Sequence, residues 1–497
     1  WCLGRELLAN MEKIEALMDP RYSNVTPETI EVFYNINAVL NSIDHLEVRG
    51  RDSAGMSLLF MLDESVFQAF EDQLKRDADP DLYEQMCRRA AQRVLGNRGM
   101  DIYTIADGDG GPYITLSLVY KVAAEIGSLG DNIRFIRNEI RNDPVLQILV
   151  GCERRHHTVS SHTRWASVGA INEANCHPLD ARTEGHPQGV QGPMHVCLNG
   201  DIDNFMQLKA AFETGGDAIQ EEISTDTKII PLQISRYLTL GQDPVEAFRL
   251  AVNDFEGSHA ISMHTALAPG KLFLAQKGSG QAVFVGLAPD HYMPTSEVYG
   301  FIEQTQQFLK MDGEKRVDGR QGPTQGQIFI LDQKSTGGLD GIQAMYYDGT
   351  PITLQPEDVK KTALTSRDIN RQDYPHYFLK EISEAPDSVA KTLYNRWKIM
   401  DNTLWAVDLD DTVIPPDLRR DVSEGQIRRI YFVGQGTAGV AALACANLLA
   451  YYLNDPALQI SAQKASELSG FMLDTGGRGA RMEDALVVAI SQSGTTT

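Results

Sequence analysis

A group of hydroxyl-bearing residues follows an apolar segment late in the sequence. Residues 486–490 (Leu-Val-Val-Ala-Ile) have the composition of a buried strand, and Ser-Gln-Ser-Gly-Thr-Thr comes directly after them. Hydroxyl groups, backbone amides and a glycine after a strand can bind a phosphate without net positive charge. We therefore predict an anion-binding loop at residues 491–496.

A glycine-rich segment precedes this loop by about fifty residues. Residues 430–433 predict a strand, and residues 434–439 (Gly-Gln-Gly-Thr-Ala-Gly) lead into a helical pattern. The spacing also fits the dinucleotide-binding fingerprint, which requires an acidic residue near the end of the next strand. Residues 461–463 (Ser-Ala-Gln) contain none. The sequence therefore favours phosphate binding over dinucleotide binding.

Asp408, Asp410 and Thr412 form a competing candidate. Their spacing resembles the nucleophile motif of haloacid-dehalogenase phosphatases, in which one Asp attacks phosphate and the next acts as acid and base. Such an enzyme needs a longer preceding strand and a complete α/β domain after it. A capped turn is the favoured interpretation.

Four polar segments lie in a fixed order between residues 46 and 227. They are Leu46–Gly55 (LEVRGRDSAG), His162–Gly169 (HTRWASVG), Leu198–Asn204 (LNGDIDN) and Ser224–Thr227 (STDT). Alone, an Asn-Gly pair is usually a turn, and an Arg-Trp pair is usually a surface cation on an aromatic ring. Together the segments resemble the class II, N-terminal-nucleophile glutamine amidotransferases, and among them the glucosamine-6-phosphate synthases. The resemblance covers most of residues 28–330.

This resemblance implies that ammonia is released from glutamine by acyl transfer, which needs a nucleophile, an oxyanion hole and a clamp on the amino acid. It implies that Arg164 binds the α-carboxylate with its planar fork and that Trp165 shapes the pocket. Asp226 and the Gly200 carbonyl are expected to bind the α-ammonium. The Asn199 side chain and the Gly200 amide are expected to form the oxyanion hole.

The nucleophile matches the family least well. The family uses an N-terminal Cys at the start of a short apolar strand, whereas Cys2 follows Trp1 and opens a segment with helical spacing. Cys2 is the candidate near the terminus, but a buried structural thiol is the favoured interpretation. The nucleophile is then expected upstream of Trp1 or is absent from a degenerate protein, and both ends of the chain are predicted to be cut.

Three further features separate this sequence from the family. Val168 stands where the family usually has His. His177 has a structural and a direct interpretation, of which the structural one is favoured. Residues 63–117 are predicted to be mostly helical and to have no counterpart in ordinary synthases. They would form either a surface for assembly or a benign insertion.

Two later segments extend the resemblance. His376–Ile382, with Glu384 and Pro386, resembles the interdomain segment of the synthases. The two glycine- and hydroxyl-rich loops resemble those of sugar isomerase (SIS) domains, although Ala438 lacks the hydroxyl usual there. The resemblance implies a sugar phosphate bound by Thr437, Ser491, Gln492, Ser493 and Thr496.

Composition excludes several classes of protein. The net charge of −22 argues against a nucleic-acid binder, because phosphate binding over a large surface needs clustered cations. Six scattered Cys without a CxxC pair predict neither a zinc site nor a disulfide scaffold, and no metal or cofactor is expected. No apolar run is long enough for a membrane span. We expect a homo-oligomeric protein in the cytoplasm.

The elements that carry these motifs fall into three parts. Thr26 and Pro27 predict a helix start, with an apolar face that continues to about Leu46. Residues 156–332 predict an α+β domain rich in antiparallel sheet, and residues 427–490 predict a parallel α/β sheet. We therefore predict an α+β Ntn-type four-layer glutaminase domain (1–355), a linker (356–425) and the first part of an α/β, flavodoxin-like SIS domain (426–497).

The predicted function is a glutamine-dependent amidotransferase that passes ammonia to a ketose phosphate, fructose 6-phosphate in the family. The family's isomerisation residues lie in a second SIS domain outside this chain. We therefore expect this chain alone not to complete the synthase reaction. The alternative is a catalytically degenerate homologue with an assembly or sensing role.

Overall fold

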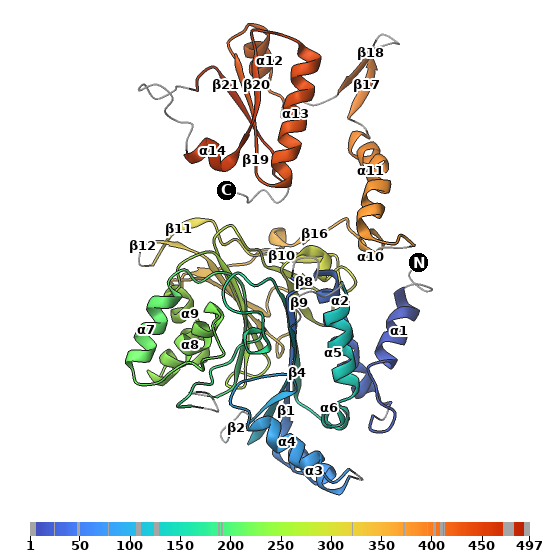
Figure 1. The fold of residues 1–497 in the computed structure, drawn as a ribbon, viewed down its shortest axis with the longest axis vertical. Helices are drawn as coiled ribbons and strands as arrows, with labels where there is room; N and C mark the ends of the chain where they lie inside the picture. The colour runs from blue at the N-terminus through green and yellow to red at the C-terminus, as the bar shows by residue number, and fades with distance from the viewer. Residues whose placement is uncertain are drawn as a thin grey trace. The chain divides into compact units, whose positions relative to one another are not determined.

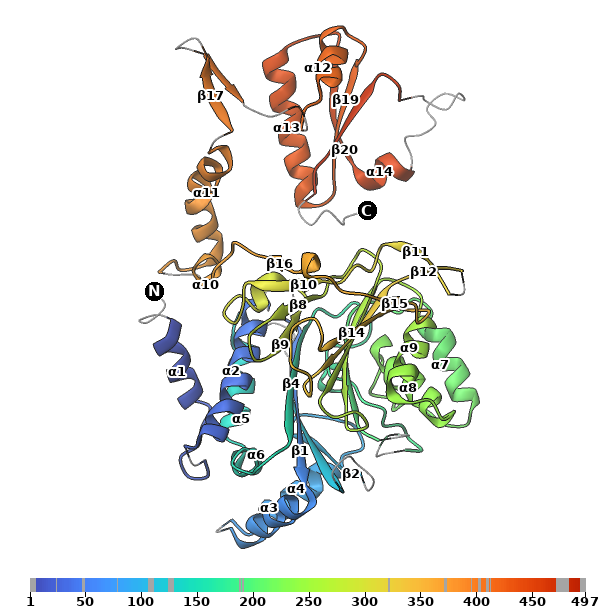
Figure 2. The same ribbon diagram turned by 180° about the vertical axis from the view of Figure 1, so that it is seen from behind.

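The computed structural model describes all residues other than 1–5, 24, 47–49, 78, 106–110, 124–128, 187–188, 190–191, 321, 371–372, 395, 401–403, 408–410, 412, 471–481 and 492–497. The chain divides into two compact units, Trp1–Ile369 and Asn370–Thr497. Figures 1 and 2 show the elements of each unit from opposite sides. None of the described helices combines the length and apolarity that a membrane span requires.

The first unit contains a four-stranded antiparallel sheet in the order β2-β3-β1-β4. Its strands are β1 (Ser53–Asp63), β2 (Gly99–Ile105), β3 (Tyr113–Ala123) and β4 (His156–Arg164). In this register Ser53 pairs with Ala123 on one side and with Arg164 on the other. β4 is therefore an edge strand, and its last residue lies beside the first residue of β1.

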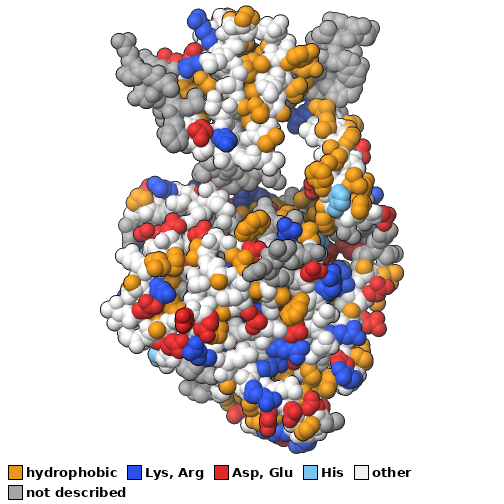
Figure 3. All heavy atoms as spheres, viewed as in Figure 1, with side chains coloured by type: hydrophobic (Ala, Val, Ile, Leu, Met, Phe, Trp, Pro, Cys, Tyr) orange, Lys and Arg blue, Asp and Glu red, His pale blue; other side chains and the backbone are white. Residues whose placement is uncertain are grey.

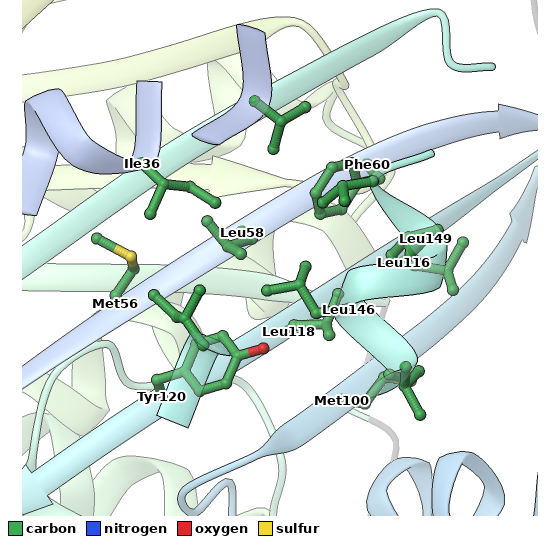
Figure 4. Packing of buried hydrophobic residues seen from close by; sticks show 14 of the residues in the cluster. Ile36, Met56, Leu58, Phe60, Met100, Leu116, Leu118, Tyr120, Leu146 and Leu149 are labelled. Carbon is green, nitrogen blue, oxygen red and sulfur yellow. The ribbon is translucent and has the colours of Figure 1, made fainter. Parts of the chain in front are cut away.

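Helices cover one face of this sheet, chiefly α2 (Pro27–Leu46), α5 (Asp131–Arg141) and α6 (Pro144–Leu149). α2 begins as predicted, because the Thr26 hydroxyl accepts a hydrogen bond from the Thr29 N–H at 3.2 Å. Between helices and sheet, Ile36, Leu58, Leu118 and Leu146 are fully buried in one continuous core (Figure 4). This packing fixes β1 and, through it, β4.

The region predicted to be a mostly helical insertion, residues 63–117, is helical only in its first half. α3 (Glu64–Arg76) and α4 (Leu82–Ala90) are helices, but β2 and β3 follow. The prediction is wrong for Gly99–Ile105 and for Tyr113 onward, because these residues pair along the sheet and β3 is buried on both faces. Aromatic and β-branched residues suit such a position. The second half of the region is therefore an integral part of the sheet.

A second sheet of six strands has the order β15-β14-β13-β7-β6-β5. Its strands are β5 (Met194–Gly200), β6 (His259–Thr265), β7 (Lys271–Lys277), β13 (Gln327–Asp332), β14 (Ile342–Tyr346) and β15 (Pro351–Ile352). α8 (Ile229–Thr239) and α9 (Pro244–Asn253) pack on one face around Phe248 and Phe273, with α7 (Phe205–Thr214) beside them. The layers therefore run helix, sheet, sheet, helix, which is the α+β class predicted (Figure 1).

A smaller sheet completes the first unit, in the order β16-β10-β8-β9. Its strands are β8 (Phe284–Leu287), β9 (Tyr292–Thr295), β10 (Gln307–Lys310) and β16 (Lys360–Lys361), and β11 (Arg316–Gly319) and β12 (Gly322–Gln325) form a separate hairpin. Residues 360–361, predicted to be part of a linker, pair with β10.

The interface between the two large sheets is partly polar. The Ser57 hydroxyl of β1 lies 2.9 Å from His264 Nε2 and 2.5 Å from His195 Nδ1, and His195 Nε2 lies 3.1 Å from Asp101. Arg182 bonds to Asp101 as well. These polar groups are all buried, so hydrogen bonds to one another replace the hydrogen bonds to water that they lose on folding.

The second unit contains a three-stranded parallel sheet in the order β20-β19-β21, as predicted. Its strands and helices are β19 (Arg429–Gly434), α13 (Thr437–Leu453), β20 (Gln459–Lys464), α14 (Ala465–Gly470), β21 (Ala485–Ala489) and α12 (Pro416–Ser423). α13 exposes apolar side chains, among them Val440, Leu443 and Tyr451. Figure 3 shows hydrophobic side chains, in orange, on the surface of the second unit.

α11 (Tyr377–Leu393) and a two-stranded hairpin, β17 (Trp397–Met400) with β18 (Leu404–Val407), precede that sheet. Asp408, Asp410 and Thr412 lie outside the described residues. The strand before them belongs to an antiparallel hairpin rather than to a parallel α/β sheet, which argues against the phosphatase alternative.

Candidate active site

A groove of about 900 Å³ lies between the edge strand β4 and the second large sheet. Its walls include all of β4, the last residues of β5, and residues 225–227. Arg164, Trp165, Asn199, Gly200 and Asp226 all line it. The groove therefore brings together the residues predicted to bind glutamine, which come from three of the four segments noted in the sequence.

Arg164 is the last residue of β4, and only 5% of it is exposed. Its Nη1 donates to the Ala170 carbonyl at 3.3 Å and its Nη2 donates to the Val168 carbonyl. Burial lowers the pKa of the guanidinium, an effect opposed by the nearby Cys176 and Asp226. The carbonyl groups of the loop that follows Arg164 thus hold its guanidinium at the groove wall. A substrate carboxylate bound there could replace the water that burial removes from the guanidinium.

Asn199 and Gly200 end β5 beside β6, where Gly200 pairs with His259. Gly200 has φ +99°, and a Cβ placed on it would lie 2.2 Å from the Ser258 carbonyl oxygen. Any other residue would therefore meet both backbone strain and a clash. The Asn199 side chain is exposed at the groove, as a donor to a substrate oxygen must be.

Asp226 begins a single turn of 3₁₀ helix, η4 (Asp226–Lys228), and only 4% of it is exposed. Its carboxylate accepts a hydrogen bond from the Ile202 N–H at 2.9 Å. Burial raises the pKa of Asp226, and the Ile202 N–H opposes that rise. The carboxylate is therefore tied to the loop after β5, close to the two candidate oxyanion residues.

The loop after Arg164 is connected to three other segments. The Ala166 N–H donates to Asp52 at 2.9 Å, the Ser167 hydroxyl donates to Asp201 at 2.8 Å, and the Ala170 N–H donates to Ser224 at 3.1 Å. Trp165 is 68% exposed at the mouth of the groove. The contact of Ser167 with Asp201 was not predicted, although both residues lie in segments that the sequence marked.

The two buried cysteines at or near the groove, Cys176 and Cys197, do not have the environment of a nucleophile. Cys197 lines the groove, but burial raises its thiol pKa to about 12. Cys176 is buried, donates to the Ala54 carbonyl at 3.0 Å, and has a pKa raised by burial. A nucleophilic thiol needs the opposite shift. Cys2 lies outside the described residues.

In the second unit, Thr437 and Ser491 follow neighbouring parallel strands. Thr437 opens α13 after β19, and Ser491 follows β21. The Ile490 N–H donates to the Val433 carbonyl at 2.8 Å, which holds the two strand ends together, and both side chains are exposed. A Cβ on Gly434 would lie 2.5 Å from the Ala438 carbonyl oxygen, so glycine allows this tight turn. Gln492, Ser493 and Thr496 lie outside the described residues.

No family model matches the chain. Curated proteins of one class, the glutamine-dependent aminotransferases, are similar to it, which confirms the resemblance predicted from the sequence segments. The relatives bear the name isomerizing glutamine–fructose-6-phosphate aminotransferase. The protein of Streptococcus mutans is 26% identical over 311 residues, which is 63% of this chain and 44% of that protein.

Two other relatives of that name are equally distant. The Streptomyces coelicolor protein is 28% identical over 335 residues, or 67% of this chain and 46% of its own length. The Sulfolobus acidocaldarius protein is 28% identical over 337 residues, or 67% of this chain and 47% of its own length. The chain therefore spans a little under half the length of the curated relatives it matches.

Two solved structures share a distant likeness. One is the allosteric regulatory enzyme of purine biosynthesis, with 17% identity and a TM-score of 0.32 over 59% of this chain and 49% of that one. The other is glutamine phosphoribosylpyrophosphate amidotransferase from B. subtilis, with 13% identity and a TM-score of 0.33 over 82% of this chain and 65% of that one.

Proposed function

We propose that this chain is the glutamine-hydrolysing part of an aminotransferase that passes ammonia to a ketose phosphate, fructose 6-phosphate being the acceptor named in its relatives. The observation that carries the proposal is the meeting of Arg164, Asn199, Gly200 and Asp226 in one groove. These groups supply a cation, an anion and two neutral donors. That set matches a zwitterionic amino acid whose side-chain carbonyl becomes an oxyanion.

In this mechanism Arg164 binds the α-carboxylate of glutamine and Asp226, with the Gly200 carbonyl, binds the α-ammonium. The nucleophile adds to the side-chain carbonyl, and the Asn199 amide and the Gly200 N–H stabilise the oxyanion that forms. Collapse of this intermediate breaks the carbon–nitrogen bond and releases ammonia. Water then hydrolyses the acyl intermediate to glutamate and frees the nucleophile.

The nucleophile in this proposal is an N-terminal-type Cys outside the described residues, as the resemblance implies. The groove runs along all of β4, whose outer edge is not paired with another described strand. A short strand could therefore pair with β4 and place a terminal thiol at Arg164 and Asn199. We therefore propose the N-terminal-nucleophile type of α+β fold for the first unit.

The degenerate alternative is less well supported. A homologue that no longer hydrolyses glutamine would not need a cation, an anion and an exposed amide together in one groove. The curated relatives also share one enzymatic name. Assembly as a homo-oligomer and a cytoplasmic location remain predictions.

For the second unit we propose binding of the acceptor's phosphate. The loops after β19 and β21 lie at the carboxyl ends of adjacent parallel strands, which is the usual ligand side of such sheets. Thr437 and Ser491 offer exposed hydroxyls there without added charge. Titration of the protein with fructose 6-phosphate tests this, and Thr437→Val is expected to weaken binding about tenfold, the loss of one hydrogen bond to a charged group.

The decisive test of the glutaminase is hydrolysis of glutamine by the full-length protein that carries this chain. Arg164→Ala is expected to lower kcat/KM about 10²-fold, chiefly through KM, because a charge-assisted bidentate contact is lost. The control is Arg236→Ala, which removes an exposed arginine of α8 outside the groove lining. Equal activity of the wild type and Arg164→Ala would remove the pocket assignment.

A further inference from the structure

We propose that His177 and Thr227 are positioning residues that fix the oxyanion loop, defined as residues 199–201, to the turn that carries Asp226. The inference rests on the proposed glutaminase function and goes beyond it, because it gives both residues, which lie at the buried wall of the groove, a role in placing the oxyanion loop. It gives a specific task to a histidine for which the sequence favoured a structural interpretation.

The first half of this connection lies at the edge of the second large sheet. Leu179 pairs with Val196 through two backbone hydrogen bonds of 2.9 and 2.8 Å. Two residues further along β5, the Leu198 N–H points to the same edge and lies 3.5 Å from His177 Nδ1. The His177 ring thus takes the place of a strand acceptor next to Asn199.

The second half leads to the ammonium-binding turn. His177 Nε2 lies 2.9 Å from the hydroxyl of Thr227, which is buried and follows Asp226 directly. Asp226 itself accepts the Ile202 N–H at 2.9 Å. The oxyanion loop is therefore held on both sides. Asp226 bonds to Ile202 directly, and His177, whose ring contacts Thr227, bonds to Leu198.

The protonation state of His177 suits this task. Its ring is buried against the His162 ring, with centroids 4.4 Å apart. Burial, with His162 and Arg164 nearby, holds the pKa of His177 well below its usual range. The ring is thus neutral, so that Nδ1 accepts from Leu198 while the Nε2 proton is donated to Thr227. One ring can serve both contacts only in this tautomer.

The expected consequence is specific to the transition state. The Asn199 amide and the Gly200 N–H must point to the position that the oxyanion occupies, and this interaction is absent from bound glutamine. Loosening the loop should therefore lower kcat much more than it raises KM, because only the Gly200 carbonyl of this loop also contacts bound glutamine. Arg164 would still bind the α-carboxylate.

The experiment measures kcat and KM for glutamine hydrolysis in the full-length protein. Thr227→Val, which keeps the shape and removes the hydroxyl, is expected to lower kcat about tenfold with KM within about twofold. Thr227→Ser should restore kcat. The matched control is Ser235→Ala, which removes a buried hydroxyl of α8 that has no hydrogen-bond partner among the described residues.

A second pair of variants tests the histidine. His177→Asn retains an acceptor near Leu198 but does not reach Thr227, so it should lower kcat as Thr227→Val does. The double variant should be no worse than either single one, since both break the same connection. Additive losses would overturn the proposal.

A spectroscopic readout separates positioning from simple loss of fold. In ¹⁵N-histidine spectra of the wild type, His177 should stay neutral with its proton on Nε2 at a pH where an exposed histidine is already protonated. Thr227→Val should shift that resonance and Ser235→Ala should not. If Arg164→Ala abolishes glutamine hydrolysis while Thr227→Val and His177→Asn leave kcat unchanged, the positioning role is wrong. If Arg164→Ala has no effect, the proposed function itself fails.

Discussion

The candidate site combines two buried ionic groups with one exposed amide. Arg164 and Asp226 are 5% and 4% exposed, and backbone groups of neighbouring loops hold both of them. Asn199 is exposed at the end of β5. Buried charges with fixed partners can bind the α-carboxylate and α-ammonium groups, which do not change during the reaction. An exposed amide can keep its hydrogen bond to the side-chain carbonyl as that carbon becomes tetrahedral.

At this scale we predict the effect of removing the Asn199 amide. Asn199→Ala should lower kcat for glutamine hydrolysis about 10²–10³-fold, because an oxyanion donor is lost, and should change KM little. The measurement is steady-state kinetics of the full-length protein. Asn253→Ala, at the exposed end of α9, is the control and should match the wild type. A rise in KM at constant kcat would instead assign Asn199 to substrate binding.

At the scale of the element, the end of β5 depends on a glycine. Gly200 and Gly216 both have positive φ, +99° and +93°, but their surroundings differ. A Cβ on Gly200 would lie 2.2 Å from the Ser258 carbonyl oxygen, whereas a Cβ on Gly216 would have no atom within 4 Å. Substitution of Gly216 therefore tests backbone strain alone, whereas substitution of Gly200 tests backbone strain together with a steric clash.

We predict that Gly216→Ala lowers the free energy of unfolding by about 1 kcal/mol, the cost of the left-handed conformation. Gly200→Ala should cost more than about 2 kcal/mol, because the Ser258 carbonyl and with it the start of β6 must also move. Chemical denaturation of both variants gives the comparison. Equal losses of unfolding free energy in the two variants would show that the connection between β5 and β6 can move to accommodate the Cβ at no energetic cost.

At the scale of the whole molecule, the first unit buries several neutral histidines. Burial lowers the pKa of His157 and His162 to about 4 and that of His259 to about 3. Burial also lowers the pKa values of His177 and His264 well below the usual range. The unfolded chain binds protons below about pH 6.5, whereas the folded chain does not. Stability should therefore fall as the pH drops from 6.5 towards 4.

We predict a steep loss of unfolding free energy across this interval, up to about 3 kcal/mol for each histidine held near a pKa of 4. His259→Gln, whose amide can keep the 3.0 Å contact with the Tyr347 hydroxyl, should reduce the slope and leave stability at pH 8 nearly unchanged. Denaturation curves from pH 8 to pH 4 measure this. The slope should persist in 0.5 M salt, because burial rather than surface charge causes it. An unchanged slope in His259→Gln would contradict the argument.

The sequence alone determined the features that depend on neighbouring residues. Thr26 and Pro27 predicted the start of α2, and alternating apolar and glycine-rich segments predicted the parallel sheet of the second unit. Arg164, Asn199 and Asp226 were selected because the short segments that carry them, in their order along the chain, resemble those of the glutamine amidotransferases. Such signals are local, because capping, strand composition and turn glycines act within a few residues.

Tertiary structure decided what depends on distant partners. β3 is a strand because it pairs with β1, more than fifty residues earlier, and both of its faces are buried; local pattern alone gave a helix instead. The contacts on which the proposed task of His177 rests exist only because folding placed its ring between Leu198 and Thr227. Whether a group is hydrogen-bonded, or a strand face is buried, depends on the residues that pack against it. In both cases those partners are remote in the sequence, so a pattern of neighbouring residues cannot predict them.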